Sequence, residues 1–466
     1  MAIQNELWRY PMKNFLILAL FLTMLFLSTV SAVAANHYIR SGASGNGSDW
    51  TNACADFTGS CAAASLVRGD TYYVADGTYA SRTFNTPASS NLVITIKKAT
   101  VSNHGTETGW DSAYGNGQAT FAGQIHFTTS NWVFDGATRN ESDWFAYAAY
   151  GFAVGTHAET TQISLLNCPA VFHNITIKYT YVKGYSNYAG LPGGTDIGAY
   201  AIHSNSTGCT DQQYTGLVFH RMLIRYGVNQ WLIRNTTGAI IEYSAAELAI
   251  GNSGNHGDAI NLYYSVQNAT IRYNQFRNEY TIACGGCGST GIMPLCCGSH
   301  GTQVYGNWFS DFRAGDGLIG YLGGISNNNK IYNNTIDGCN SGTGGSGGLN
   351  LGGTGNTAYN NIWTNCGNIP FAGVTHNYNA FPDSNARGEG NAQLNVSTSV
   401  FVNYAGKDFR LNSPTAAGTT LSSPFNVDPL GKTRGASGIW NRGTFEIATT
   451  SGDVTPPLVP VGLTIQ

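Results

Sequence analysis

The strongest constraint on the fold of this chain is a short pattern that recurs between residues 176 and 363. Each copy is a short strand-like run, an Asn, and an apolar residue two places after the Asn. The clear copies are TIRYNQF (270–276), QVYGNWF (303–309), KIYNNTI (330–336) and TAYNNIW (357–363), with Asn at 274, 307, 334 and 361. Looser copies at 176–182, 218–224 and 240–246 have Thr180, Met222 and Ser244 at the Asn position. Such a drifting period is typical of a solenoid whose repeats carry loops of variable length.

The repeats are predicted to consist of strands. Apolar and polar residues alternate within each copy with a period of two, whereas helical repeats would show a period of 3.6. The composition agrees, because 59 glycines and only 11% charged residues suit short strands and tight turns better than helices. The predicted fold is therefore all-β: a single-stranded, right-handed parallel β-helix, in which rungs stack with their strands in register.

Aligning the copies on the Asn position predicts which side chains face the core. The residue three places before it is Ile177, Phe219, Ile241, Ile271, Val304, Ile331 or Ala358. The residue two places after it is Val182, Ile224, Ala246, Phe276, Phe309, Ile336 or Trp363. We expect both columns to be buried. We also expect the corner Asn to adopt left-handed backbone and to bond to its counterpart in the next rung, forming a ladder.

These rungs resemble those of the pectate-lyase-like superfamily of right-handed β-helix proteins, over about residues 36 to 447. HYIRSGASGNGSDW (37–50) and VRGDTYYVADGTY (67–79) are similar to the first strands and N-terminal cap of secreted bacterial members. FVNYAGKDFRLNSPTAAGT (401–419) and DPLGKTRG (428–435) are similar to their closing segment, where a strap ends the solenoid. The superfamily includes lyases, hydrolases, epimerases, adhesins and structural proteins, so the resemblance implies a fold more directly than an activity.

The N-terminus is predicted to be an export signal. Lys13 precedes an apolar run at 15–30, and AVAA (32–35) supplies a small-x-small cleavage site after Ala34 or Ala35. Met12 is an alternative start, because a signal peptide beginning there has ordinary proportions. A membrane anchor is the alternative to a signal, but the run is short and a cleavage site follows it.

Three segments are therefore expected: a signal peptide at 1–35, a β-helix domain at 36–447 and a Pro-rich tail at 448–466. No later segment reaches the roughly 18 apolar residues needed to span a bilayer. We expect the mature protein to be secreted or on the cell surface, with bacterial origin implied by the resemblance, and to meet a membrane only during export. The net charge of −3 gives no reason to expect nucleic acid as a partner.

Ten cysteines in an exported chain indicate disulfides. Cys339 and Cys366 each follow a ladder Asn by five residues, so in-register stacking places their Cα atoms ~4.8 Å apart, within disulfide range. By looser analogy Cys168 should pair with Cys209, and Cys54 with Cys61 in an N-terminal loop. The remaining cysteines are expected to pair among themselves: Cys284, Cys287, Cys296 and Cys297. Zinc is the alternative for these four, but Cys296 and Cys297 are adjacent and lack the usual spacer, so no metal site is predicted.

The first candidates for chemistry come from a second recurring segment, HGDAINL (256–262). It aligns with AGDGLIG (314–320) and GSGGLNL (345–351), and more loosely with GAYAIHS (198–204). The candidate catalytic groups or calcium ligands are His256, Asp258 and Asp316, because acid–base catalysis needs groups that titrate near neutral pH. His203 and Asn261 would line the groove, in one outward column with Asn350. The alternative is structural, since Asp before a strand caps a turn by accepting backbone N–H bonds.

A second outward column lies two residues before the corner: Lys178, His220, Glu242, Arg272, Tyr305, Tyr332 and Tyr359. Three residues after the corner lie Lys183, Arg225, Glu247, Arg277, Ser310, Asp337 and Thr364. Lys178, His220, Glu242, Arg272 and Tyr305 are candidate substrate-binding residues, because cations neutralise a uronic acid and tyrosines stack on sugar rings. The alternative is a solvated face of stacked salt bridges with a tyrosine ladder.

No catalytic signature of the superfamily's enzymes is intact in this chain. Alginate lyases of the superfamily use a Lys and an Arg, and the Arg stands in a pattern like L-R-H-G. The nearest match to that pattern here is IMPLCCGSHG (292–301), which has no Arg. The motifs of polygalacturonases and the D-P-H-D of alginate epimerases are absent. No carboxylate cluster like the calcium site of pectate lyases is visible, so no cofactor is predicted, and calcium is the one that the resemblance allows.

The leading hypothesis is a secreted, carbohydrate-active β-helix that acts on acidic polysaccharide, such as a polyuronate, as a lyase or hydrolase. The alternative is a non-catalytic surface or matrix β-helix that binds glycans or neighbouring proteins. A serine or cysteine nucleophile lacks support, because no Gly-x-Ser-x-Gly elbow is present and the cysteines are expected to be bridged.

Overall fold

The computed structural model describes residues 34–155, 161–165, 172–184, 200–204, 214–227, 229–249, 257–277, 289–292, 298–310, 319–320, 325–339 and 347–447. The chain divides into two compact units, Met1–Ala35 and Asn36–Gln466, and the β-helix belongs to the second. In these ranges no helix is long and apolar enough to cross a membrane. The predicted signal at 1–35 lies outside them except for its last two residues, and the tail at 448–466 lies wholly outside.

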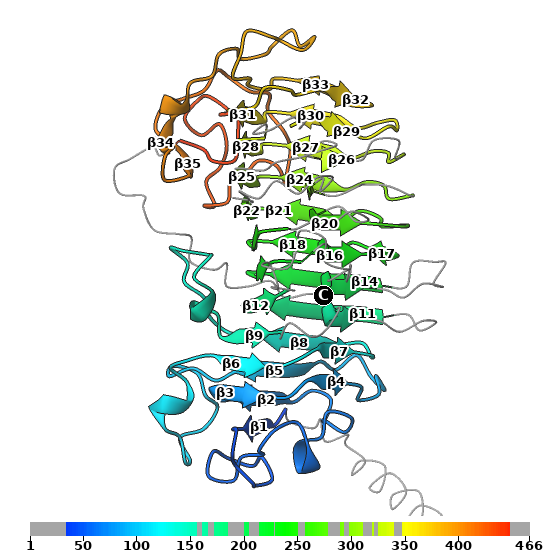
Figure 1. The fold of residues 1–466 in the computed structure, drawn as a ribbon, viewed down its shortest axis with the longest axis vertical. Helices are drawn as coiled ribbons and strands as arrows, with labels where there is room; N and C mark the ends of the chain where they lie inside the picture. Colours follow the sequence, from blue (N-terminus) through cyan, green and yellow to red (C-terminus); the bar gives the residue numbers. More distant parts are fainter. Residues whose placement is uncertain are drawn as a thin grey trace, which may run out of the picture. The chain divides into compact units, whose positions relative to one another are not determined.

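Three parallel sheets form the walls of a right-handed parallel β-helix, and the chain passes through sheets A, B and C in turn (Figure 1). Sheet A contains β1 (Asn36–Ile39), β2 (Thr71–Val74), β5 (Ile94–Lys98), β8 (Trp132–Asp135), β11 (Phe172–Lys178), β14 (Tyr214–His220), β17 (Thr236–Thr237), β18 (Ile240–Glu242), β21 (Thr270–Arg272), β24 (Gln303–Tyr305), β27 (Lys330–Tyr332), β30 (Thr357–Tyr359) and β33 (Thr375–Asn377). Sheet B contains β3 (Gly77–Tyr79), β6 (Ala119–Phe121), β9 (Phe152–Val154), β12 (Thr180–Lys183), β15 (Leu223–Arg225), β19 (Ala245–Glu247), β22 (Gln275–Arg277), β25 (Trp308–Ser310), β28 (Thr335–Asp337) and β31 (Ile362–Thr364).

Sheet C contains β4 (Arg82–Phe84), β7 (Ile125–Phe127), β10 (Thr161–Leu165), β13 (Tyr200–Ser204), β16 (Asn229–Ile233), β20 (Gly257–Leu262), β23 (Ser289–Ile292), β26 (Ile319–Gly320), β29 (Leu349–Asn350) and β32 (Phe371–Ala372). Short 3₁₀ helices lie at Gly59–Cys61, Ser112–Tyr114, Tyr147–Ala149 and Thr398–Val400. An antiparallel hairpin of β34 (Phe401–Asn403) and β35 (Asp408–Leu411) stands outside the three sheets.

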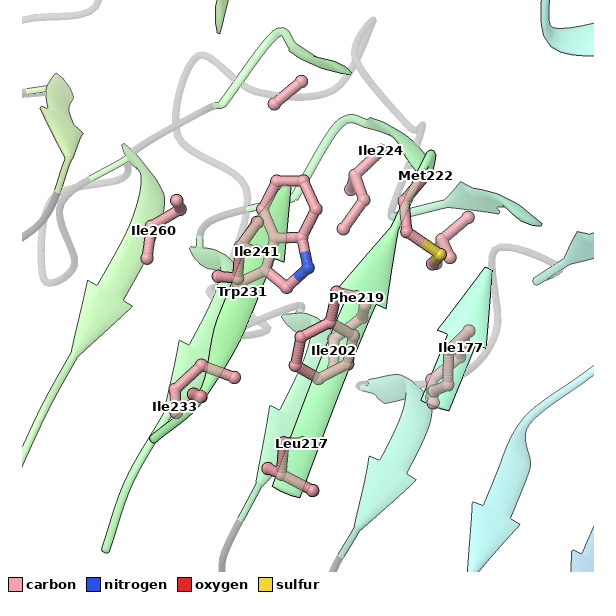
Figure 2. Close-up of a cluster of buried hydrophobic side chains, with 14 of the residues drawn as sticks. Ile177, Ile202, Leu217, Phe219, Met222, Ile224, Trp231, Ile233, Ile241 and Ile260 are labelled. Atoms are coloured by element: carbon pink, nitrogen blue, oxygen red, sulfur yellow. The ribbon is translucent and has the colours of Figure 1, made fainter. Parts of the chain in front are cut away.

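The predicted register of sheets A and B is confirmed. The column on sheet A pairs rung by rung from Ile177 to Ala358. The column on sheet B pairs from Val182 to Trp363. Both columns are buried in one continuous core, and Figure 2 shows side chains from the three sheets meeting there. Burying an aliphatic or aromatic side chain of this size contributes about 1.5–3 kcal/mol, so the core is the main source of stability.

The corner between sheets A and B holds the predicted Asn ladder. Asn274 donates Nδ2–H to Oδ1 of Asn307 at 3.0 Å, and the same bond links Asn307 to Asn334, Asn334 to Asn361 and Asn361 to Asn379. Each Oδ1 also accepts the backbone N–H of the preceding ladder residue. These bonds satisfy amides that the core would otherwise leave unpaired. Asn379 was not foreseen as a member.

The expectation that the ladder Asn itself is left-handed is wrong. Left-handed backbone belongs instead to the residue before it, where φ lies between 49° and 63°. These residues are, in chain order, Tyr179, Arg221, Tyr243, Tyr273, Gly306, Asn333, Asn360 and Tyr378. The turn is thus made by one residue whose side chain points outward, and the following residue turns its amide inward. This division explains why Tyr and Arg are tolerated there.

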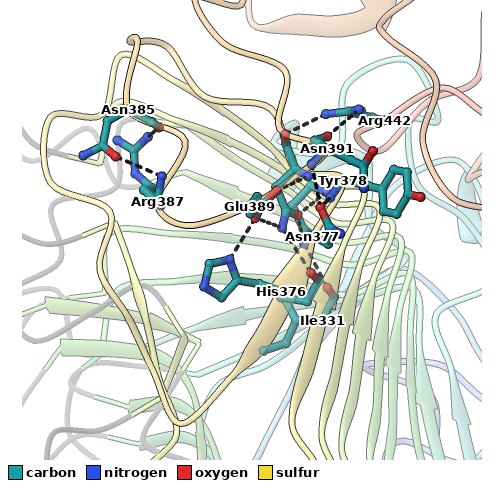
Figure 3. A network of polar contacts seen from close by, with 12 residues as sticks. Ile331, His376, Asn377, Tyr378, Asn385, Arg387, Glu389, Asn391 and Arg442 are labelled. Carbon is teal, nitrogen blue, oxygen red and sulfur yellow. Dashed lines mark hydrogen bonds and ion pairs between the residues drawn. The ribbon is translucent and has the colours of Figure 1, made fainter.

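The last rung ends the ladder on a buried carboxylate. Oε1 of Glu389 accepts Nδ2–H of Asn379 at 2.6 Å and lies 2.9 Å from Nδ1 of His376. Arg442 donates from Nη1 to the Asn379 carbonyl at 2.7 Å. Figure 3 shows His376, Glu389 and Arg442 near the end of the sheet. The Asn ladder therefore ends on a carboxylate rather than on a further Asn.

Two of the predicted disulfides lie in the described residues, and both are present. Cys339 and Cys366 join consecutive rungs with a Cα–Cα distance of 5.1 Å, and Cys54 and Cys61 close a loop in the N-terminal cap. The other predicted cysteines, Cys168, Cys209, Cys284, Cys287, Cys296 and Cys297, lie outside the described residues.

The C-terminal segment covers part of the outer surface that the sequence predicts to be solvated. Phe425 packs on Tyr305 and Tyr332, with ring centroids 4.9 and 4.8 Å apart, and both tyrosines are buried. Tyr404 and Lys407 bond to the Asp337 carboxylate at 2.7 and 3.0 Å. Ser310, Asp337 and Thr364 are also buried. Their side chains leave the core as predicted, but the strap excludes them from water.

Candidate functional site

The outer face of sheet C brings together a histidine, an arginine and two tyrosines, His203, Arg234, Tyr263 and Tyr264, which we name the Arg234 site. His203 lies on β13 and is in register with Leu232 of β16, so Arg234 is its diagonal neighbour one rung further. Ile233 pairs with Leu262 of β20, which places Tyr263 beside Arg234 on the next rung. Three consecutive rungs thus each supply part of the cluster.

Among the residues that the structure describes, Arg234 has no carboxylate partner. Its guanidinium carbon lies 4.9 Å from the ring centroid of Tyr263 and 5.8 Å from that of Tyr264, which are cation–π distances. Its Nε atom is buried and makes no hydrogen bond. Within the described ranges, most other arginines are bonded to a carboxylate or to carbonyl oxygens, as Arg225 is to Glu247 and Arg442 to Asn379. No carboxylate in the described part of the chain therefore neutralises the stacked charge of Arg234.

His203 is neutral at physiological pH. Burial, and to a lesser degree the charge of Arg234, lower the pKa of its imidazole from 6.5 to about 4. Both causes disfavour the protonated form, because the imidazolium would be poorly solvated and would face a like charge. A neutral imidazole can accept a proton.

Asn261 lies two residues before Tyr263 and is fixed by polar neighbours. Its Nδ2 group donates to Oδ1 of Asn229 at 2.8 Å and to Oδ2 of Asp258 at 3.0 Å. Asp258 and Asn229 are both buried at the start of their strands, where they pair in register. The geometry gives Asp258 a positioning role toward Asn261, and its carboxylate is nearly inaccessible to solvent, with 1% of the residue exposed.

Of the other candidates from this segment, His256 and Asp316 lie outside the described residues. The alignment that suggested Asp316 is wrong by one residue. Ile260 pairs with Ile292, Ile292 with Ile319 and Ile319 with Leu349, whereas the sequence alignment set Leu318 opposite Ile260. The sequence alignment also omitted the rung of β23, which lies between β20 and β26. His203, Asn261 and Asn350 do share one column, with Leu232 and Gly320 also in it.

The five candidates on the second outward column lie on sheet A, away from the Arg234 site, and four of them bond to one another. Glu242 bonds to Nδ1 of His220 at 2.9 Å and to Nε of Arg272 at 2.7 Å, while Arg272 also donates to the Tyr305 hydroxyl at 3.1 Å. Lys178 forms an ion pair with Asp135 at 3.0 Å. Burial alone would raise the pKa of Glu242, but the hydrogen bonds and charges of His220 and Arg272 outweigh it and lower that pKa. These contacts favour the structural interpretation, a ladder of stacked salt bridges.

Sequence reasoning missed Arg234, Tyr263 and Tyr264. The strand that leads to Arg234 was hard to recognise because buried and exposed residues do not alternate in it. Gln230, Trp231, Leu232 and Ile233 are all buried. The WLIR segment (231–234) would have aligned with INLY (260–263) if Trp231 had been set opposite Ile260, as the structure does.

The residues that could hold a metal ion are few. In the described part of the chain, no three His, Cys, Asp or Glu side chains gather in a group suited to a metal. His256 and Asp316, two of the residues considered as calcium ligands, lie outside this part of the chain, and no step below depends on a metal.

Comparison with solved structures shows the fold. The chain is similar to the crystal structure of the pectate lyase Pel9A, with a TM-score of 0.54 and 14% identity over 90% of this chain and 98% of that one. The similarity to the family 6 alginate lyase AlyGC is weaker, with a TM-score of 0.35 and 12% identity over 77% of this chain and 53% of that one. The similarity to a mannuronic acid-specific family 6 lyase from human gut microbiota is also weaker, with a TM-score of 0.31 and 12% identity over 69% of this chain and 84% of that one. No family model and no curated protein sequence matches the chain. At 14% identity the likeness to Pel9A shows that the fold is a parallel β-helix, and it does not show an activity.

Proposed function

We propose that this chain is a carbohydrate-active β-helix that binds an acidic polysaccharide at the Arg234 site and cleaves it by β-elimination. The observation that carries the proposal is the guanidinium of Arg234, which is stacked on tyrosine rings and has no carboxylate partner in the described residues. A uronic acid supplies the missing carboxylate. The pectate lyase Pel9A has the same fold, which adds support for this substrate class.

The residues of the site fit the chemistry of elimination. Arg234 would pair with the substrate carboxylate and stabilise the negative charge that develops when the proton on the adjacent carbon is removed. His203, being neutral, would accept that proton. The electron pair of the broken C–H bond forms a carbon–carbon double bond, the bond to the glycosidic oxygen breaks, and that oxygen takes a proton from the Tyr263 hydroxyl or from water. The products are an unsaturated sugar and a new chain end.

Substrate binding would itself make His203 a stronger base. The charge of Arg234 is one of two causes that lower the pKa of this imidazole. A carboxylate bound to the guanidinium offsets that charge, so the pKa of His203 should rise toward neutrality in the complex. The base is then best matched to its task only when substrate is present.

Elimination is favoured over hydrolysis by the scarcity of acids on this face. Glycoside hydrolysis generally uses a pair of carboxylic acids on opposite sides of the bond. Among the described strands of sheet C, Asp258 is the one acidic residue, and it is buried against Asn261. Arg234 with a neutral imidazole matches a lyase better.

The proposed compartment is outside the cell. Disulfides such as those at Cys54–Cys61 and Cys339–Cys366 persist in oxidising environments. The signal at 1–35 and cleavage near Ala35 belong to this proposal, as does a bacterial source.

The test is incubation of the mature chain with a panel of polyuronates. Ultraviolet-absorbing unsaturated product is expected, and Arg234→Ala should abolish it. Arg40→Ala is the matched control, because Arg40 stacks on Tyr114 at 4.9 Å without a carboxylate partner in the described residues, but at the N-terminal end of sheet A. New reducing ends without unsaturation would indicate a hydrolase instead. Binding without turnover, lost in Arg234→Ala, would indicate the non-catalytic alternative, and neither turnover nor binding would reject the proposal.

A further inference from the structure

A second cavity, on the outer side of sheet B, has a different character from the Arg234 site. It encloses about 710 Å³ between the loop at 141–145, strands β22 and β25, and the strap at 405–410. Small-molecule sites usually occupy about 300–1,000 Å³. We name it the sheet B groove, and the residues used below are Trp144, Phe145, Gln275, Arg277, Trp308 and Arg410.

Aromatic rings line the groove, and the loop that supplies two of them is held firmly. Trp144 and Phe145 are only half-buried, although the guanidinium carbon of Arg139 lies 4.0 Å from the Trp144 ring and that of Arg277 lies 3.9 Å from the Phe145 ring. Trp144 also contacts Trp308, with ring centroids 5.2 Å apart. Its Nε1 donates to the Glu141 carbonyl at 3.1 Å, and its own carbonyl accepts from the Tyr150 hydroxyl at 2.7 Å. The rings are thus fixed before any ligand arrives.

Each cation that lines the groove is paired with a carboxylate. Its cations are Arg221, Arg277, Lys407 and Arg410, and its carboxylates are Glu141, Asp143 and Asp408. Arg277 is paired with Glu247 at 2.6 Å, Lys407 with Asp337 at 3.0 Å, Arg410 with Asp408 at 2.6 Å, and Arg221 with Glu141. No excess of positive charge remains, in contrast to Arg234. A polyanion would gain little here, because it would have to compete with carboxylates already in place.

The combination of fixed rings with paired, planar polar groups suits an uncharged ligand with many hydroxyls. A sugar ring presents apolar C–H faces, which stack on aromatic rings, and equatorial hydroxyls, which bond to planar side chains. A guanidinium in an ion pair can still donate N–H bonds to hydroxyl oxygens, and a carboxylate in an ion pair can still accept O–H bonds. The amide of Gln275 can do both. We propose that the sheet B groove binds a neutral oligosaccharide segment, separately from the acidic sugar proposed for sheet C.

The inference does not depend on the proposed function. The groove lies on sheet B and the Arg234 site on sheet C, and they share no residues. A chain with both sites could hold a neutral part of a mixed polysaccharide while the Arg234 site engages its acidic part. Either site can fail its test while the other passes.

The test is titration of the full mature chain with neutral hexasaccharides of glucose, xylose, mannose and galactose, and with hexagalacturonate. Binding is measured by calorimetry and by tryptophan fluorescence. At least one neutral hexasaccharide should bind, with an affinity that salt does not change and with a change in the emission of Trp144 and Trp308. Trp144→Ala should weaken binding about tenfold, which corresponds to 1.4 kcal/mol. Trp144→Phe, which keeps a ring, should bind more tightly than Trp144→Ala.

Tyr147→Ala is the matched control, because Tyr147 is an exposed aromatic residue that follows the same loop and does not line the groove. It should bind like the parent chain, and the melting temperatures of all variants should be compared so that a misfolded variant is recognised. The proposal is overturned if no neutral hexasaccharide binds, if Trp144→Ala binds as well as Tyr147→Ala, or if hexagalacturonate alone binds at the groove in a salt-dependent way.

Discussion

Asn379 donates its Nδ2–H to Oε1 of Glu389 at 2.6 Å and its backbone N–H to Oε2 of the same carboxylate at 2.9 Å. Each earlier Asn of the ladder gives these two hydrogen bonds to the Oδ1 of the next Asn. Glu389 therefore takes the place of the Asn that a further rung would have supplied. An uncapped ladder would leave two buried donors unpaired at the end of the solenoid, where stacking of another chain would be encouraged.

Replacing Glu389 should destabilise the fold. Glu389→Ala leaves the Asn379 donors and the His376 imidazole without this buried partner, so the free energy of unfolding should fall by about 1–3 kcal/mol. Denaturant unfolding of the parent and the variant measures the change. Glu107→Ala is the control, because 87% of that side chain is exposed, and its effect should stay within about 0.5 kcal/mol. Equal effects would show that Glu389 is not a cap.

Loss of the disulfide between rungs should cost more than loss of the one in the cap. Cys339 and Cys366 close a separation of 27 residues, whereas Cys54 and Cys61 close one of 7. Loop-closure entropy predicts a contribution of about 3 kcal/mol for the longer loop and less for the shorter. Thermal unfolding of the Cys339→Ala/Cys366→Ala and Cys54→Ala/Cys61→Ala double variants compares them, and a larger loss from the cap pair would contradict this ranking.

Two columns of the core could be predicted from the sequence because they are tied to the corner Asn. An alternation of period two, anchored on a residue that recurs at 274, 307, 334 and 361, fixes both the strand register and the face of each side chain. The same anchor placed Cys339 opposite Cys366. Where no such anchor exists, as on sheet C, the alignment slipped by one residue at Ile319.

The candidate site was harder to predict because it depends on that unanchored sheet and on contacts distant in the sequence. Arg234 meets Tyr263 only through the pairing of β16 with β20. The feature that singles it out, the lack of an ion pair with any described residue, is one that no local sequence pattern reveals. The burial of Tyr305 beneath Phe425 likewise joins residues that are 120 positions apart. Alternation shows which way a side chain leaves a strand, but not what later covers it.

The salt-bridge ladder on sheet A should make stability depend on acid. Burial opposes ionisation of Glu242, but His220 and Arg272 outweigh burial and lower its pKa below the ordinary value of 4.5. A carboxyl with a lowered pKa stabilises the fold above its ordinary pKa, and the contribution is lost as the pH falls through the folded pKa. Glu242→Gln should therefore be less stable than the parent at neutral pH, with a difference that shrinks in acid. Unfolding curves at several pH values test this, and a difference that is independent of pH would contradict it.

The coupling between His203 and Arg234 can be measured directly by the titration of the imidazole. Burial, the larger cause, and the charge of Arg234 lower the pKa of His203 to about 4, so its NMR signals should not titrate near 6.5 in the folded chain. In Arg234→Ala the pKa should rise because the like charge is gone, but it should stay below 6.5 because the burial remains. Arg40→Ala, which removes a stacked arginine at the N-terminal end of sheet A, should leave the His203 pKa unchanged. If Arg234→Ala leaves the pKa of His203 unchanged, the guanidinium does not act on this imidazole. Substrate binding at Arg234 could then not raise the basicity of His203, as the proposed mechanism requires.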